Sequence, residues 1–250
     1  MIIIKTEHEI ELMKQAGKIS SRALKLAGES IEPGITTEQI DSIVRKYIES
    51  HGAKPSFLGY GGFPASACVS VNNVVIHGIP SRNCVVKNGD IVSIDVGAYL
   101  NGFHSDNAWT FPCGDISEEA QRLLDTTKES LYEGIKMAKV GNRIGDIGST
   151  VQQYAEERGY SVVRKFVGHG VGASLHEDPS VPNYGKAGRG IRLSKGMVIA
   201  IEPMINVGGY DVLVKDDDWT TVTADGSLSA HFEHSVAITE DGPVILTDPS

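Results

Sequence analysis

The chain repeats part of its own residue pattern at a fixed offset of 107 positions, and this repeat restricts the possible folds more than any other feature. In one block a helical pattern recurs, with matches at Gly34 and Gly141, Ile40 and Ile147, Val44 and Val151, Tyr47 and Tyr154, and Gly52 and Gly159. In another block the strand-like residues 89–95 recur as 196–202. A helix followed by a strand is common, but an identical offset in two separate blocks makes chance the lesser explanation. We therefore expect one domain over 1–250 with two related halves, roughly 1–110 and 111–250.

Acidic residues interrupt apolar stretches that otherwise have the pattern of buried strands. Asp95, Glu202 and Glu233 each lie within or at the end of such a stretch. Asp106 follows Asp95 by 11 residues, after the turn-like residues 99–102, so the two aspartates can face the same way on one antiparallel hairpin. Burying a lone carboxylate is costly unless it is paired or binds a metal.

A histidine among glycines adds a nitrogen ligand to this set. His169 lies in Val167-Gly168-His169-Gly170-Val171-Gly172, where the glycines allow close backbone approach and unusual φ angles. For any one of the acids alone, an exposed or salt-bridged strand end is the simpler interpretation. Taken together, the four acids and the histidine indicate a shared cation.

Four carboxylates and one imidazole are hard or borderline ligands, which suit a pair of divalent first-row metal ions better than a closed structural zinc site. Two such ions about 3.5–4 Å apart can share a water molecule, convert it to hydroxide near neutral pH and polarise a carbonyl group. The chemistry implied is metal-assisted hydrolysis. Cobalt, manganese, iron and zinc all suit these ligands, so the residues do not select among them.

Capping boxes and apolar stripes predict the helices. Thr6 with Glu9 opens one amphipathic helix, and Thr36 with Gln39 opens the next. Two further helices are expected at 118–139 and 144–158. Strands are expected to fill most of 67–111 and 161–247. Helix pairs that alternate with strand blocks favour an α+β fold with antiparallel sheet over a doubly wound parallel sheet.

Composition narrows the class of protein. A chain of 250 residues can bury about 70–75% of its unfolded surface in a single core. The balance of 23 basic against 32 acidic residues gives −9, which argues against a nucleic-acid partner. The 3 cysteines have no C-x-x-C spacing and fit a reducing cytosol. Because the apolar start Met1–Ile4 is too short for a signal peptide and no run reaches membrane length, we expect a cytoplasmic protein without a membrane partner. We also expect it to be a monomer.

The chain resembles the type I methionine aminopeptidases, in their short bacterial form, over essentially its whole length. The residues that carry the resemblance are Asn72-Asn73-Val74-Val75-Ile76-His77-Gly78-Ile79-Pro80, the pair Asp95 and Asp106, Gly168-His169-Gly170-Val171-Gly172, Leu175-His176-Glu177, Ile201-Glu202-Pro203 and Phe232-Glu233-His234. The resemblance implies the pita-bread fold, in which two pseudo-symmetric halves with antiparallel sheet surround a dinuclear metal site. It also implies removal of the N-terminal methionine from nascent proteins and peptides with a small second residue.

The resemblance gives each metal ligand a role. It implies that Asp95 chelates one of two divalent ions, that His169 and Glu202 bind the other, and that Asp106 and Glu233 bridge them. It further implies that a metal-activated hydroxide attacks the first peptide bond while Glu202 carries the proton to the leaving amine. The partners would be N-terminal peptide substrates, above all nascent chains at the ribosome.

Two further histidines gain roles only through the resemblance. His77 lies at a predicted strand end, where on its own a structural histidine is the better interpretation. His176 follows His169 by seven residues, which would place it on the same rim of the cleft. Beside a dinuclear site, either could hydrogen-bond a substrate carbonyl or amide as charge develops. No comparable argument exists for the remaining histidines, which we expect to be structural or solvated. They are His8, His51, His104, His231 and His234.

The resemblance also supplies a pocket for the methionine side chain. Its residues would be Phe57, Tyr60, Phe63, Cys68, Leu175 and Trp219. Aromatic walls and a thiol suit a polarizable thioether, with sulfur–aromatic contacts on the order of 1 kcal/mol. Ordinary core packing explains such a cluster equally well. The family often has an aromatic residue at position 175, so Leu175 changes the expected shape of the pocket.

Related enzymes share the five ligand types, which leaves alternatives open. Prolidases and aminopeptidases that cleave before proline generally carry an additional N-terminal domain, whereas this sequence opens with the first predicted helix. Type II methionine aminopeptidases carry a helical insertion between the last two acidic ligands, and only 31 positions separate Glu202 from Glu233. A non-catalytic binding module on the same fold is disfavoured because all five ligands are intact.

Overall fold

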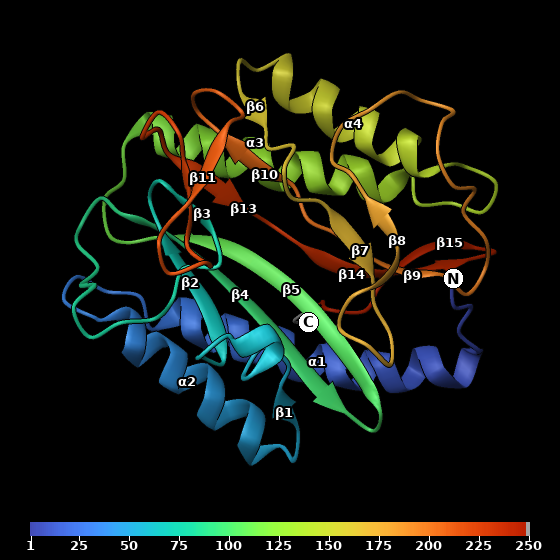
Figure 1. Ribbon diagram of the computed structural model, residues 1–250, viewed down its shortest axis with the longest axis horizontal. Helices are drawn as coiled ribbons and strands as arrows, with labels where there is room; N and C mark the ends of the chain where they lie inside the picture. Colours follow the sequence, from blue (N-terminus) through green and yellow to red (C-terminus); the bar gives the residue numbers. More distant parts are fainter. Residues whose placement is uncertain (249–250) are drawn as a thin grey trace.

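Four helices lie on two sides of the strands in the computed structural model, which describes residues 1–248 (Figure 1). The helices are α1 (Glu7–Glu29), α2 (Thr37–Ser50), α3 (Glu118–Lys136) and α4 (Ile144–Glu156), with a short 3-10 turn, η1 (Tyr60–Gly62). α1 and α2 lie along one side, and α3 and α4 along the other. Both helices predicted for the second half are confirmed, and each ends within three residues of the expected boundary. None of the described helices has the length and apolar character that crossing a membrane requires.

Side-chain hydrogen bonds confirm both predicted capping boxes. The backbone N–H of Glu9 donates to Thr6 Oγ1 at 3.2 Å, and the backbone N–H of Thr6 donates to the Glu9 carboxylate at 2.7 Å. Thr36 and Gln39 make the same two bonds, at 3.2 and 2.8 Å. Each box satisfies backbone donors that the first helical turn leaves unpaired, so both helices begin where the sequence predicts.

The strands pair only in antiparallel fashion within the described residues, as the sequence predicts. One sheet contains β1 (Lys54–Pro55), β2 (Ala67–Val71), β4 (Ile91–Leu100) and β5 (Phe103–Pro112). A second contains β7 (Gly168–Gly170), β8 (Glu177–Val181), β9 (Val198–Ile201), β14 (His234–Thr239) and β15 (Gly242–Ile245). Two small sheets contain β6 (Ser161–Val162), β10 (Met204–Asn206) and β13 (Ser229–His231), and β3 (Val74–Ile76), β11 (Val212–Val214) and β12 (Thr221–Thr223).

Strands are sparser in the second half than predicted. They fill most of 67–111 but less than half of 161–247, so the expectation for the second block was wrong. The long connection between β8 and β9 contains Gly185, Gly188 and Gly190, all at positive φ. Glycine adopts this conformation without steric cost, and it bends the backbone away from an extended strand.

Backbone contacts recur at the same 107-residue offset as the sequence pattern. Gly34 N–H donates to the Val86 carbonyl at 2.8 Å, and Gly141 N–H donates to the Leu193 carbonyl at 3.0 Å. Both glycines have positive φ, at 103° and 92°. The isolated bridge between Thr36 and Val85 likewise corresponds to one between Arg143 and Arg192. The chain therefore enters α2 and α4 through the same backbone arrangement.

Two main apolar clusters stabilise the two sides of the molecule. One packs α1 and α2 against the first sheet and includes Ile40 and Ile94. The other packs α3 and α4 against second-half strands and includes Leu123 and Ile199. Trp109, half-buried on β5, contacts both clusters. β5 thus lies where the two sides meet.

Candidate metal centre

A regular hairpin, β4 and β5, holds the two aspartates. Asp95 pairs with Ala108, and Asp106 pairs with Gly97. Because side chains alternate along a strand and paired residues share a face, both carboxylates face the same side of the sheet. The predicted hairpin is confirmed. β4 does not end at Asp95, however, but continues to Leu100 because β1 and β5 both pair with this last part of it.

The other three candidate ligands come from the second half. His169 lies in β7, Glu202 directly follows β9, and Glu233 lies between β13 and β14. Hydrogen bonds join this half to β5: Glu233 N–H donates to the Ala108 carbonyl at 2.9 Å, and Ser235 Oγ donates to the Asp106 carbonyl at 2.8 Å. These bonds hold the two halves of the ligand set together.

The glycines beside His169 provide room rather than unusual backbone angles. A Cβ atom on Gly168 would lie 2.3 Å from the Ala200 carbonyl oxygen, and one on Gly170 would lie 2.3 Å from the Asp178 carbonyl oxygen. The predicted close approach is therefore confirmed. The predicted unusual φ was wrong, because none of the glycines at 168, 170 and 172 has a positive φ.

The candidate ligand atoms converge. Those of Asp106, His169 and Glu233 all lie within 4.8 Å of one another. His169 Nε2 lies 3.6 Å from Asp106 Oδ2 and 3.6 Å from Glu202 Oε1. His169 Nδ1 lies 2.8 Å from the Gly170 carbonyl oxygen, which can only accept, so Nδ1 carries the proton. The Nε2 lone pair therefore faces two carboxylates, which is the tautomer that a metal-binding histidine requires.

Buried oxygen atoms without partners support a cation at this position. Within the described chain, Asp95 Oδ1, Asp106 Oδ1 and Glu233 Oε1 are buried and accept no hydrogen bond. Burial, reinforced by the neighbouring carboxylates, raises the pKa of Asp95, Glu202 and Glu233 well above the usual range. Since these groups cannot all ionise side by side without compensation, the donor set fits divalent cations.

All the predicted site residues line a single cavity of about 320 Å³. They are Phe57, Tyr60, Phe63, Cys68, His77, Asp95, Asp106, His169, Leu175, His176, Glu202, Trp219 and Glu233. The cavity is also lined by residues that the sequence did not indicate, which are Ile76, Lys165, Phe166 and Val167. The structure therefore brings together every candidate and adds a wall from the segment just before His169.

The apolar end of this cavity is a packed cluster. Phe57, Phe63, Cys68 and Leu175 are buried against one another, and Trp219 packs edge-on against Phe63 with ring centroids 5.1 Å apart. Cys68 pairs with Asp95 across β2 and β4, which places the cluster directly beside the carboxylates. Burial, and then Asp95, raises the pKa of the Cys68 thiol, so this wall is uncharged.

Both candidate donor histidines lie around the cavity. His77 follows β3 with φ of 58°, a left-handed conformation that is uncommon for a residue with a side chain. His176 lies near the rim, with Nδ1 2.9 Å from Tyr60 Oη and its ring centroid 4.0 Å from that of His169. Burial lowers the pKa of each to about 4, with a smaller contribution from His176 at His77 and from His169 at His176. Both imidazoles are therefore neutral at pH 7.

Sequence reasoning missed His231, which it took as structural or solvated. The side chain is buried, and Nε2 lies 3.8 Å from Glu202 Oε2 without a hydrogen-bond partner among the described residues. A signal existed, because a residue two positions before Glu233 on a strand faces the same way. Phe166 gave no comparable signal.

His104, whose Nδ1 lies 2.9 Å from Ser56 Oγ, is in contact with another side chain as expected for a structural histidine.

Comparison with known proteins identifies the family. Residues 11–240 match metallopeptidase family M24. The chain is 58% identical over 247 residues to the methionine aminopeptidase of Clostridium perfringens, with 99% of each chain covered. The crystal structure of the Thermotoga maritima methionine aminopeptidase matches with a TM-score of 0.98 and 48% identity, covering 99% of this chain and 100% of that one. The Pyrococcus horikoshii prolidase has a similar fold, with a TM-score of 0.81 and 26% identity over 65% of its own length. The chain belongs to metallopeptidase family M24 and, within it, to the bacterial type I methionine aminopeptidases.

Proposed function

We propose that this methionine aminopeptidase removes N-terminal methionine with the help of two divalent cations. Asp95 would hold one ion, His169 and Glu202 the other, and Asp106 and Glu233 would contact both. The observation that carries this proposal is the set of three buried carboxylate oxygens without partners, beside an Nε2 lone pair of His169 that faces carboxylates. Such a cluster is strongly unfavourable unless cations lie within it.

When bound, the ions would activate a water molecule and polarise the carbonyl of the first peptide bond. We assign the proton transfer in this reaction to Glu202. Its Oε1 lies 3.6 Å from His169 Nε2, and its Oε2 lies 3.8 Å from His231 Nε2, so each carboxylate oxygen is near one imidazole. Glu202 takes the proton from the attacking water and delivers it to the leaving amine.

His176 and His77 stabilise charge on the substrate. His176 Nδ1 lies 2.9 Å from Tyr60 Oη. When this hydroxyl donates the hydrogen bond, the proton of the neutral imidazole is on Nε2. That N–H is available to the carbonyl oxygen, where negative charge develops in the transition state. His77, held between Phe166 and Trp219 at ring distances of 5.7 and 6.0 Å, offers a second neutral donor.

The apolar end of the cavity would bind the methionine side chain. Phe57, Tyr60, Phe63, Cys68, Leu175 and Trp219 provide aromatic, aliphatic and thiol surface next to the carboxylates. The thioether gains contacts on the order of 1 kcal/mol with aromatic rings of this kind. A small second residue would be favoured.

The proposal extends to the whole chain. Because the candidate ligands come from both sides of residue 110, the halves 1–110 and 111–250 would act only together, as one catalytic domain. Nascent chains at the ribosome would be the cellular substrates, and the enzyme would work in the cytoplasm as a monomer. The net charge of −9 favours protein rather than nucleic acid as the partner.

Reconstitution tests the proposal. Protein stripped by a chelator would be loaded separately with Co²⁺, Mn²⁺, Fe²⁺ and Zn²⁺, and its metal content and kcat/KM measured on peptides that begin Met-Ala, Leu-Ala and Ala-Pro. We expect two ions per chain at full activity and a strong preference for Met-Ala. Full activity with one ion would refute the dinuclear site. Equal cleavage of Leu-Ala would refute the pocket, and faster cleavage of Ala-Pro would favour the prolidase alternative.

A further inference from the structure

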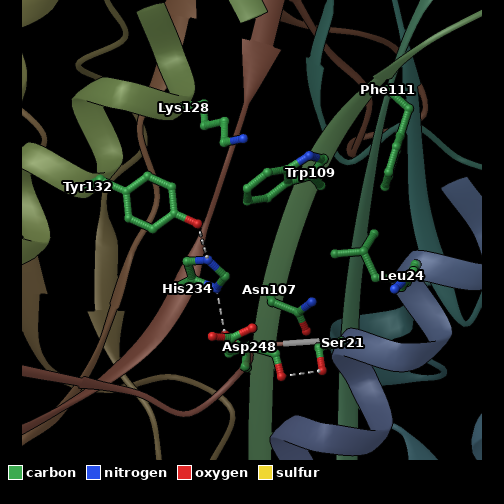
Figure 2. Close-up of a pocket in the computed structure, with 11 residues that line it drawn as sticks. Ser21, Leu24, Asn107, Trp109, Phe111, Lys128, Tyr132, His234 and Asp248 are labelled. Atoms are coloured by element: carbon green, nitrogen blue, oxygen red, sulfur yellow. Dashed lines mark hydrogen bonds between the residues drawn. The ribbon is translucent and has the colours of Figure 1, made fainter. Parts of the chain in front are cut away.

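A second cavity, of about 340 Å³, lies outside the catalytic one and shares no lining residue with it. We call it the rear cavity. Figure 2 shows Trp109, Phe111 and Asn107 pointing into it from β5, Leu24 and Ser21 from α1, and Lys128 and Tyr132 from α3. Its volume is within the range of small-molecule sites and slightly exceeds that of the catalytic cavity. The rear cavity is therefore large enough for a ligand.

The rear cavity is one peptide bond away from two metal ligands. Asn107 follows Asp106 on β5, and His234 follows Glu233 at the start of β14. Because successive strand residues face opposite sides, the acids line the catalytic cavity while their neighbours line the rear one. A shift of Asn107 or His234 would thus be felt at Asp106 or Glu233 through the backbone.

A buried polar group without a partner lies beside this space. The Asn107 side chain is 1% exposed, and its Oδ1 accepts no hydrogen bond from any described residue. His234 beside it is already engaged, with Nδ1 2.9 Å from Thr247 Oγ1 and Nε2 3.5 Å from Tyr132 Oη. Buried amide oxygens are rarely left unpaired in folded proteins. Asn107 Oδ1, like Asn183 Oδ1 and Asn206 Oδ1 elsewhere, is therefore an open acceptor that water or a ligand can satisfy.

The walls combine aromatic rings with positive charge. Trp109, Phe111 and Tyr132 offer flat apolar surface, and Lys128 Nζ lies 5.2 Å from the centroid of the Trp109 ring. Lys25 on α1 also lines the cavity, and neither lysine forms an ion pair with another residue that the structure describes. Asp248 is the one acid among the lining residues. Both lysines are exposed and have no acidic partner among residues 1–248, in a chain with 32 acidic and 23 basic residues.

We propose that the rear cavity is a second ligand site for a flat aromatic anion, and that its occupancy changes turnover at the metal centre. The ring would stack against Trp109, a ring N–H or amino group would donate to Asn107 Oδ1, and a carboxylate or phosphate would bind between Lys25 and Lys128. A bicyclic carboxylate and a purine nucleoside monophosphate share this chemistry.

Calorimetry on the metal-loaded enzyme distinguishes these two sources. Indole-3-acetate and AMP would be titrated separately, each in the presence of saturating methionine, which occupies the catalytic cavity. We expect at least one probe to bind one to one despite the methionine. Absence of binding by both probes, or their displacement by methionine, would overturn the proposed site.

Charge variants localise the binding. The double variant Lys25→Gln/Lys128→Gln should weaken binding roughly tenfold or more, because charge-assisted hydrogen bonds are lost. Lys46→Gln/Lys87→Gln removes the same charge from exposed residues outside the cavity and should bind as the wild type does. Equal affinities in the two double variants would refute the assignment.

The coupling has its own measurement. At saturating probe, kcat for a Met-Ala peptide should change by roughly fivefold or more while KM stays constant, as expected for an effector that does not compete with substrate. A rise in KM alone would show competition at the catalytic cavity and overturn the proposal. Binding with unchanged kcat would leave a ligand site but refute its link to the metal centre.

Discussion

The two halves of the molecule hold their candidate ligands in different ways, although the same backbone contacts recur in both. In the first half, Asp95 and Asp106 lie within one regular hairpin of two ten-residue strands. In the second half, His169, Glu202 and Glu233 come from short strands or lie just beyond their ends. A ladder of backbone hydrogen bonds fixes an acid within a strand, whereas contacts from neighbouring segments must fix one beyond a strand end.

The matched pair Asp95 and Glu202 illustrates the difference. Asp95 is paired on both sides, with Cys68 on β2 and Ala108 on β5. Glu202 lies after the last residue of β9, and its carbonyl accepts a hydrogen bond from Asn183 Nδ2 at 3.0 Å. The glutamate has one methylene more than the aspartate, which gives the less firmly held position a longer reach. Similar sequence blocks thus supply similar ligands with unequal local support.

The largest expected effect is the loss of turnover when either of the two acids that would contact both ions is removed, one from each half. Asp106→Ala in the first half and Glu233→Ala in the second should both abolish turnover and lower the metal content, because each group would serve both ions. Losing a group that only orients a ligand already costs roughly 10–100-fold in affinity or activity, so a shared ligand should cost more. Metal content by mass spectrometry and single-turnover rates would test this. Asp241→Ala, at an exposed acid, is the control; full activity with unchanged metal in either variant contradicts the dinuclear model.

The next effect separates two histidines of the second half whose rings are 4.0 Å apart. His176→Ala should lower kcat by about 10²–10³-fold, leave KM nearly unchanged and retain the metals, because its interaction forms mainly in the transition state. His169→Ala should instead lose affinity for one ion. Parallel measurement of kinetics and metal binding tests both variants, and loss of metal from His176→Ala would show that its assigned role is wrong.

His77, in the first half, should make the free energy of unfolding depend on pH. Burial holds the pKa of His77 near 4, whereas it is about 6.5 in the unfolded chain. Between these values the unfolded state binds more protons, so His77 makes the free energy of unfolding fall as the pH drops from about 6.5 to about 4. The loss attributable to His77 would be at most about 3 kcal/mol.

His77→Asn should flatten this dependence, because asparagine does not titrate and tolerates the left-handed φ of 58°. Urea unfolding of the metal-free wild type and variant, at about pH 7 and about pH 5, measures the difference. His51→Asn, at an exposed histidine, should leave the slope unchanged. If wild type and His77→Asn lose the same stability on acidification, the neutral state of His77 is not what makes the fold sensitive to acid.

The smallest effect concerns the two helices that begin at matched positions. Thr36 caps α2 through its side chain, whereas Arg143, 107 residues later, makes no such bond to α4. Thr36→Ala should therefore cost about 1 kcal/mol of unfolding free energy, and Arg143→Ala no more than about 0.5 kcal/mol. Urea unfolding at neutral pH would measure both. Equal losses would mean that the second half has no weaker cap than the first.

Much of the site was predictable because it depends on local pattern. Capping boxes, the aspartate hairpin and acids within apolar strands each follow from residues close in sequence. Convergence on one cavity followed from the cost of burying Asp95, Glu202 and Glu233 separately, together with the family resemblance.

What the sequence did not predict depends on contacts between distant segments. His231 approaches Glu202 because β13 pairs with β10, with Met204 opposite His231, and no local pattern specifies that pairing. The rear cavity requires α1, α3 and β5 to meet around Asn107. Alternation along a strand shows which side a residue faces, but it does not show what covers that side. The glycines beside His169 were misjudged because the constraint is the volume of a side chain, not the backbone angle.

The contact of Gly168 and Gly170 with carbonyl oxygens of neighbouring strands limits how this catalyst could be re-engineered. Replacing Phe57, Phe63 or Leu175 would change only side-chain volume around the proposed methionine pocket, so libraries at these positions can search for new first-residue preferences. Any side chain at position 168 or 170 would instead displace a backbone carbonyl and carry His169 with it. We therefore expect most tolerated substitutions to lie in the pocket walls. β7, which carries the candidate ligand His169, should tolerate almost none at positions 168 and 170.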